Sequence, residues 1–142
     1  MKVFFGGLLV FVLIGGCFAQ ERYVQVTSGG GVVGTATRYK ISRDGRVLKG
    51  KGLGEINYTE ESKLKRRHAR KYYKKSKTLL ASITGFDHPG NMYYSLLVHN
   101  QGTESQMTWG DTSHAVPEDA EKLYEEINTA LTGLTFVPVL RK

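Results

Sequence analysis

The histidines of this sequence are its first candidates for acid–base or metal chemistry, and they are His68, His88, His99 and His114. Zinc ligands on one helix are commonly four residues apart, and no two of these histidines have that spacing. His88 follows Asp87, which resembles a general base beside an orienting carboxylate. His114 lies three residues after Asp111 and has the same composition. Both pairs also fit solvated loop residues, and a catalytic role would require Asp87, His88 and His114 to converge in one cleft.

Nucleophilic side chains in a catalytic pattern are missing from the sequence. No serine lies in the nucleophile-elbow pattern. The only cysteine, Cys17, lies within an apolar leader, so the mature chain has no thiol nucleophile and no zinc finger. We therefore expect no enzymatic activity, no cofactor and no metal site.

A glycine-rich segment from Gly29 to Gly34 matches the G-x-G-x-x-G pattern of dinucleotide-binding loops. Such a site needs a helix after the loop, whereas the residues at 35–41 alternate like a strand. The segment therefore predicts a hairpin connection. It is either a mobile loop or a loop inserted into a partner's groove, where missing side chains let the backbone approach closely. The candidate partner-binding residues are Ser28, Gly29, Gly30, Gly31 and Gly34.

Positive charge is concentrated in one segment. The chain has a formal net charge of +7, and residues 63–77 alone contain nine Lys and Arg side chains. The rest of the mature chain is mildly acidic. This run is either a solvated helix face or a contact surface for acidic extracellular polymers, anionic lipid or an acidic protein partner. Secretion argues against nucleic acid. The candidate polyanion-binding residues are Lys63, Arg66, Arg67, Arg70, Lys71, Lys74 and Lys75.

The first nineteen residues have the form of a secretory signal. Lys2 precedes an apolar run, and the small-x-small tripeptide that ends at Ala19 would be cleaved before Gln20. The apolar run is too short for a transmembrane helix. In a bacterial source Cys17 would be a candidate lipid anchor, whereas in a eukaryotic source Asn57 would be a candidate N-glycosylation site. Residues 20–142 are long enough for a single domain.

Hydrophobic periodicity predicts an α+β fold. We expect strands at 23–27, 35–41 and 47–49 and a helix from Glu60 to Leu80 with Thr59 as its N-cap. A hairpin from 92 to 109 follows, with Val98 opposite Thr103. A second helix begins at Pro117, and residues 136–140 form an edge strand at best. The expected fold is an antiparallel sheet of about four to five strands, in the order βββαββα, covered on one face by two helices.

Several of these motifs together resemble the emfourin family, which are small inhibitors of thermolysin-type metalloproteases. The matching parts are the strand ending in Ser28-Gly29-Gly30 with Gly34 soon after, the segment 44–47, a helix after Thr59-Glu60-Glu61, and the block 86–131. The basic run and the leader depart from the family pattern. The resemblance implies a non-enzymatic protein that binds a protease, with residues 28–34 in contact.

The sequence thus predicts a secreted, extracellular binding protein that is not an enzyme. The first candidate is an emfourin-like metalloprotease inhibitor, whose partner is an extracellular protease. The alternative is a structural component of an extracellular matrix, such as a biomineral one, that binds acidic polymers through its basic helix. Neither candidate binds nucleic acid.

Overall fold

The computed structural model describes residues 21–140. The expected signal segment 1–19, with Cys17, lies outside the described residues. The elements follow each other along the chain as β1 (Arg22–Gly30), β2 (Ala36–Ser42), β3 (Arg46–Gly52), β4 (Tyr58–Lys63), α1 (Arg66–Ser82), β5 (Met92–Asn100), β6 (Thr103–Trp109), α2 (Glu118–Thr132) and β7 (Val137–Pro138).

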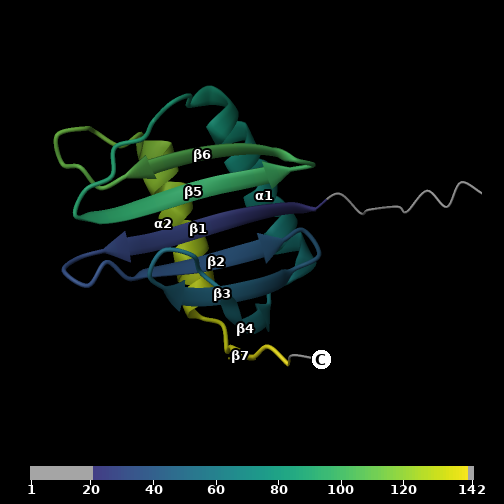
Figure 1. Cartoon of the computed structure of the whole chain (residues 1–142). Helices are drawn as coiled ribbons and strands as arrows, with labels where there is room; N and C mark the ends of the chain where they lie inside the picture. Colours follow the sequence, from purple (N-terminus) through teal and green to yellow (C-terminus); the bar gives the residue numbers. More distant parts are fainter. Residues whose placement is uncertain (1–20, 141–142) are drawn as a thin grey trace, which may run out of the picture.

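The strands form one antiparallel sheet of seven, in the spatial order β6-β5-β1-β2-β3-β4-β7. Figure 1 shows both helices behind this sheet, each crossing several strands. The expected sheet of four to five strands in the order βββαββα is therefore wrong. The chain makes a fourth strand before its first helix and adds a last, short edge strand after its second.

The first error lies at β4, because residues expected to start a helix form a strand instead. Glu60 and Glu61 resemble the acidic first turn of a helix, but they lie opposite Lys49 and Leu48 of β3. Their carboxylates form ion pairs across strands, with Lys49 at 3.1 Å and with Arg46 at 2.9 Å. These non-local pairs stabilise a strand whose own residues show no clear alternation.

The helix consequently begins later than expected, at Arg66. Its N-cap residue, Lys65, makes no side-chain capping bond, and its first turn contains no acidic residue. Cations in the first turn are unfavourable for a helix, since the amide end of the helix dipole is positive. Packing of the apolar face against the sheet must therefore stabilise α1.

The β5–β6 hairpin is correctly placed, but its register differs from the expected one by two residues. Val98 lies opposite Ser105, and Tyr94 lies opposite Trp109. The two-residue turn places Gln101 at φ 53° and Gly102 at φ 86°, a conformation that usually selects Asn-Gly. A shift of two residues keeps the same side chains on the same face, because side chains in a strand alternate with period two.

The core lies between the sheet and the two helices. It includes Tyr72 and Tyr73 of α1, and Trp109, whose ring lies 5.1 Å from the ring of Tyr124. No helix within residues 21–140 is both long enough and apolar enough to span a membrane. The larger apolar side chains that are almost completely buried are Val24, Val26, Ile41, Val47, Leu96, Met107, Ile127 and Leu131.

Candidate functional site

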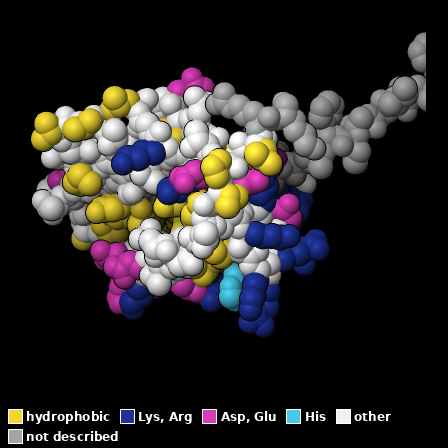
Figure 2. Space-filling view, turned by 90° about the horizontal axis from the view of Figure 1, so that it is seen from below, with side chains coloured by type: hydrophobic (Ala, Val, Ile, Leu, Met, Phe, Trp, Pro, Cys, Tyr) yellow, Lys and Arg dark blue, Asp and Glu magenta, His cyan; other side chains and the backbone are white. Residues whose placement is uncertain are grey.

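Loops and turns at the two ends of the strands have different chemical character. One end carries the β1–β2 loop, which is on the left in Figure 1, and the other carries the β2–β3 and β5–β6 turns on the right. Figure 2 shows hydrophobic side chains gathered toward the left end of the molecule and Lys and Arg side chains toward the lower right. We call the end with the β1–β2 loop the apolar end, and the end with the β2–β3 and β5–β6 turns the basic end.

The seven predicted polyanion-binding residues are all exposed, but they do not form one uniform face. Lys63 lies at the end of β4 rather than in the helix. Lys71 and Lys75 both contact Glu126 of α2, with Lys75 Nζ 2.9 Å from Glu126 Oε2. Hydrogen bonds from the two lysines lower the pKa of the Glu126 carboxyl. These two cations are therefore partly neutralised within the protein.

The remaining predicted cations of α1 have no such partner. Within the described chain, no carboxylate lies at ion-pair distance from Arg66, Arg67, Arg70 or Lys74. Arg66 and Arg67 lie at the positive end of the helix dipole, which adds to their field. This part of α1 is a surface with uncompensated positive charge.

Two arginines far from the basic run extend this surface. Arg22 at the start of β1 and Arg43 in the β2–β3 turn line a pocket of about 430 Å³ with residues of α1 and of the β5–β6 turn. We call it the cation pocket. Three other pockets of the described chain each contain at least one Asp or Glu side chain, whereas this one contains none. Its lining residues are Arg22, Arg43, Arg70, Tyr73, Lys74, Lys77, Asn100 and Gln101.

A backbone hydrogen bond and a cation–π contact link the elements that line the cation pocket. The amide of Arg43 donates to the carbonyl oxygen of Arg22 at 3.3 Å, and the Arg43 guanidinium carbon lies 5.3 Å from the Tyr73 ring centroid. Within residues 21–140, Nε of Arg22 and Nε of Arg43 are buried and have no acceptor. A buried donor without an acceptor costs about 1–3 kcal/mol, so this arrangement is not explained by stability alone. Arg22 and Arg43 were not predicted as binding residues, because in the sequence each lies far from the basic run.

The glycine-rich segment is divided between a strand and a loop. Ser28, Gly29 and Gly30 belong to β1, and only Gly31 and Gly34 of the predicted residues lie in the connection to β2. Gly29 is buried, and a Cβ there would meet the side chains of Ala36 and Tyr93. These three positions are therefore part of the sheet rather than an exposed contact loop.

Apolar side chains that the sequence analysis did not select surround the loop. Val32 and Val33 at its tip are exposed, as are Leu53 in the β3–β4 connection and Met92 at the start of β5. The positions of Gly31 and Gly34 bring Met92 and Leu53 beside the loop. We call Val32, Val33, Leu53 and Met92 the apolar tip.

Two of the histidines, His88 in the loop before β5 and His114 in the loop after β6, are in contact with each other. The rings of His88 and His114 stack at 3.6 Å, and Nδ1 of His114 lies 2.9 Å from Asp111. Ser113 Oγ lies 3.1 Å from the same Nδ1. A Ser-His-Asp triad needs the serine and the carboxylate on opposite ring nitrogens, so this trio lacks triad geometry. Within residues 21–140, no hydrogen bond joins the Asp87 side chain to this cluster, and the Asp87 backbone forms an isolated β-bridge with Thr108.

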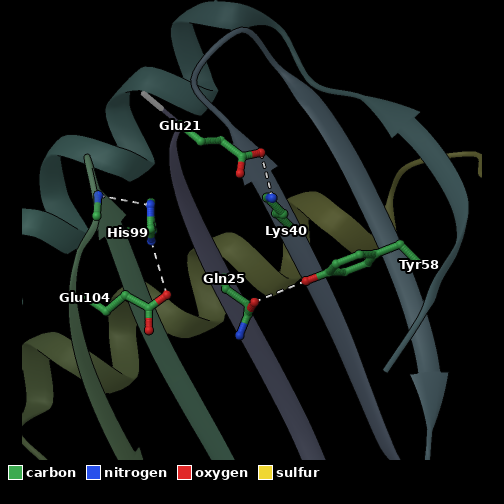
Figure 3. Close-up of polar contacts among 7 residues, drawn as sticks. Glu21, Gln25, Lys40, Tyr58, His99 and Glu104 are labelled. Atoms are coloured by element: carbon green, nitrogen blue, oxygen red, sulfur yellow. Dashed lines mark hydrogen bonds and ion pairs between the residues drawn. The ribbon is translucent and has the colours of Figure 1, made fainter. Parts of the chain in front are cut away.

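The face of the sheet opposite the helices carries polar side chains that bind one another (Figure 3). Tyr58 Oη donates to Gln25 at 3.1 Å, and the amide of Gly102 donates to His99 Nε2 at 3.3 Å. His99 Nδ1 can therefore donate to Glu104, 3.1 Å away. Among residues 21–140, no three His, Cys, Asp or Glu side chains are grouped so as to hold a metal ion.

Asn57, the candidate glycosylation site, is exposed and lies just before β4 rather than before a helix.

A comparison with models of known protein families finds no match, and a search of curated protein sequences finds none either.

Proposed function

We propose that this protein binds the acidic polysaccharide of an extracellular matrix through its basic end, as a structural component of that matrix. The proposal rests on Arg66, Arg67, Arg70 and Lys74, for which no carboxylate within the described chain lies at ion-pair distance. Cations already paired within a protein gain little from an external anion, whereas unpaired exposed cations attract polyanions over a distance set by the salt concentration.

The aromatic residues of α1 favour polysaccharide over nucleic acid. Tyr72 and Tyr73 interrupt the basic run, but both side chains are buried in the core. Buried rings cannot stack on bases, which is the usual contribution of aromatic residues to binding single-stranded nucleic acid. The exposed cations of α1 therefore recognise a polymer mainly through its charge.

Chromatography of residues 20–142 on a heparin-type resin tests this proposal. The triple variant Arg66→Gln/Arg67→Gln/Arg70→Gln should elute at clearly lower salt than the unmodified protein. The variant Lys49→Gln/Lys51→Gln/Lys122→Gln removes the same charge elsewhere and should elute close to the unmodified protein. Equal shifts for the two variants would show that only net charge matters.

A protease-binding role, which the resemblance to the emfourin family implies, is a second candidate. The apolar tip favours it, because four exposed apolar side chains beside a glycine loop suit insertion into a partner's groove. One segment on which the resemblance rests has a different structure from the expected one, because Thr59-Glu60-Glu61 lies in β4 rather than before a helix.

Titration against a thermolysin-type protease tests the second candidate. Inhibition at micromolar concentration that is lost in Val32→Asp/Val33→Asp, and retained in Val137→Asp/Leu140→Asp, would support it. The control pair is also exposed but lies at the C-terminal edge of the sheet. No inhibition by the unmodified protein would remove this candidate.

A further inference from the structure

The cation pocket gathers charge from distant parts of the sequence. Arg22 and Arg43 come from the sheet, whereas Arg70, Lys74 and Lys77 come from successive turns of α1. No ion pair within the described chain involves any of these five side chains. Like charges held close together repel each other, and the attraction of each cation to a bound anion would offset this repulsion.

We propose that the cation pocket binds one sulfate ester of the polysaccharide, together with the sugar that carries it. The proposal rests on the polysaccharide-binding function above and names the group that this site recognises. The exposed cations of the first turn of α1 would then attract neighbouring units of the polymer, while the pocket fixes its position.

The arrangement of donors favours a tetrahedral group over a planar one. The cations that line the pocket belong to three separate elements, β1, the β2–β3 turn and α1, rather than to one helix. A sulfate ester presents three terminal oxygens in different directions, whereas a carboxylate presents two in one plane. Asn100 adds a neutral donor, because its Oδ1 already accepts from Tyr73 and leaves its amide nitrogen for a ligand.

The size of the pocket also fits a sugar sulfate. Its volume of about 430 Å³ lies within the range of about 300–1,000 Å³ that is usual for small-molecule sites. A sulfate ion alone would leave most of it empty. The site is therefore large enough for one sulfated sugar unit, with the polymer continuing along the exposed side of α1.

Calorimetric titration of residues 20–142 with a sulfated disaccharide and with its unsulfated uronate counterpart tests the proposal. The sulfated form should bind at least fivefold more tightly. The variant Arg22→Gln/Arg43→Gln should weaken its binding at least tenfold, whereas Arg66→Gln/Arg67→Gln should change it less than threefold. Because Arg22 and Arg43 are half-buried, the exposed pair Arg70→Gln/Lys77→Gln is a second variant that should show the same loss without a folding defect.

The outcomes separate this proposal from the function on which it rests. If polymer retention is intact but the pocket variants bind the disaccharide normally, the cation pocket is not the site. Equal affinity for the sulfated and uronate forms would overturn the preference for sulfate, as would tighter binding of a matched phosphate ester. If the unmodified protein does not bind the polymer at all, the polysaccharide-binding function itself is wrong.

Discussion

The hydroxyl group of Tyr73 donates a hydrogen bond to Oδ1 of Asn100, at 2.9 Å. This bond joins the third turn of the basic helix to the end of β5, beside the cation pocket. The same ring lies beside the guanidinium of Arg43. One core residue thus holds three chain segments whose cations and amides would receive an anion.

Replacing Tyr73 by phenylalanine should remove this link while keeping the ring in the core. We expect the free energy of unfolding to fall by about 1 kcal/mol, the usual net value of such a hydrogen bond. Tyr72→Phe is the control, since within the described chain the Tyr72 hydroxyl makes no side-chain hydrogen bond. Urea unfolding measures both, and a larger loss for Tyr72→Phe would contradict the role given to the Tyr73 bond.

Glu126→Gln should strengthen binding of acidic polysaccharide, because it releases Lys71 and Lys75 from their shared carboxylate. The variant should elute from a heparin-type resin at higher salt than the unmodified protein. Glu125→Gln removes the same charge from an exposed neighbour and should have a smaller effect. Exposed ion pairs contribute roughly 0–1 kcal/mol, so thermal stability should change little. Equal shifts in elution for the two variants would mean that pairing with Glu126 does not restrain these lysines.

Gly45→Ala should be much more destabilising than Gly54→Ala. Both glycines have positive φ, at 101° and 66°, so alanine is strained at either position. A Cβ at Gly45 would also strike the carbonyl oxygen of Leu64, whereas at Gly54 it would meet nothing within 4 Å. We expect a loss of about 1 kcal/mol for Gly54→Ala and of at least about 3 kcal/mol for Gly45→Ala in chemical unfolding. Similar losses would show that the turn beside Leu64 yields easily.

Tyr124 should make stability depend on pH in the alkaline range. Burial raises the pKa of its hydroxyl to about 12, from an ordinary value of 10.0. Between these values the unfolded chain loses the Tyr124 proton while the folded chain keeps it, so stability decreases as pH rises from 10 to 12. At about 1.4 kcal/mol per pKa unit, the loss approaches about 3 kcal/mol.

Comparison with Tyr124→Phe isolates this contribution. At pH 8 the variant should be less stable by about 1 kcal/mol, because it lacks the bond from Tyr124 Oη to the Thr27 carbonyl at 3.3 Å. The difference should shrink and then reverse above pH 10. A difference that stays constant to pH 12 would contradict the raised pKa.

Local patterns in the sequence were informative where one face of an element is buried. The alternation in 92–98 predicts β5, and the apolar stripe that follows Pro117 predicts α2, Glu118–Thr132. The predicted register of the hairpin was wrong by two residues, because Gln101 adopts a positive φ that glutamine rarely has. A longer loop was the ordinary expectation for this sequence.

Features that depend on distant partners could not be predicted in this way. β4 pairs with β3 on one side and with β7 on the other, and Glu60 and Glu61 form ion pairs with Lys49 and Arg46 of β3. Locally the same glutamates resemble a helix start. The basic run was visible as sequence. Its division into paired and unpaired cations was not, because Glu126 lies about fifty residues further along the chain.

Binding of acidic polysaccharide by the unpaired cations of the basic end should depend strongly on the salt concentration. The measurement is the dissociation constant of residues 20–142 for a heparin-type polymer at salt concentrations from about 50 to about 300 mM. Each lost ionic contact should lower the slope of log affinity against log salt concentration by about one or less. We expect tight binding with a steep slope for the unmodified protein. The slope should become clearly shallower in Arg66→Gln/Arg67→Gln/Arg70→Gln and stay unchanged in Lys49→Gln/Lys51→Gln/Lys122→Gln. Weak binding, or the same slope in all three proteins, would contradict the proposed function.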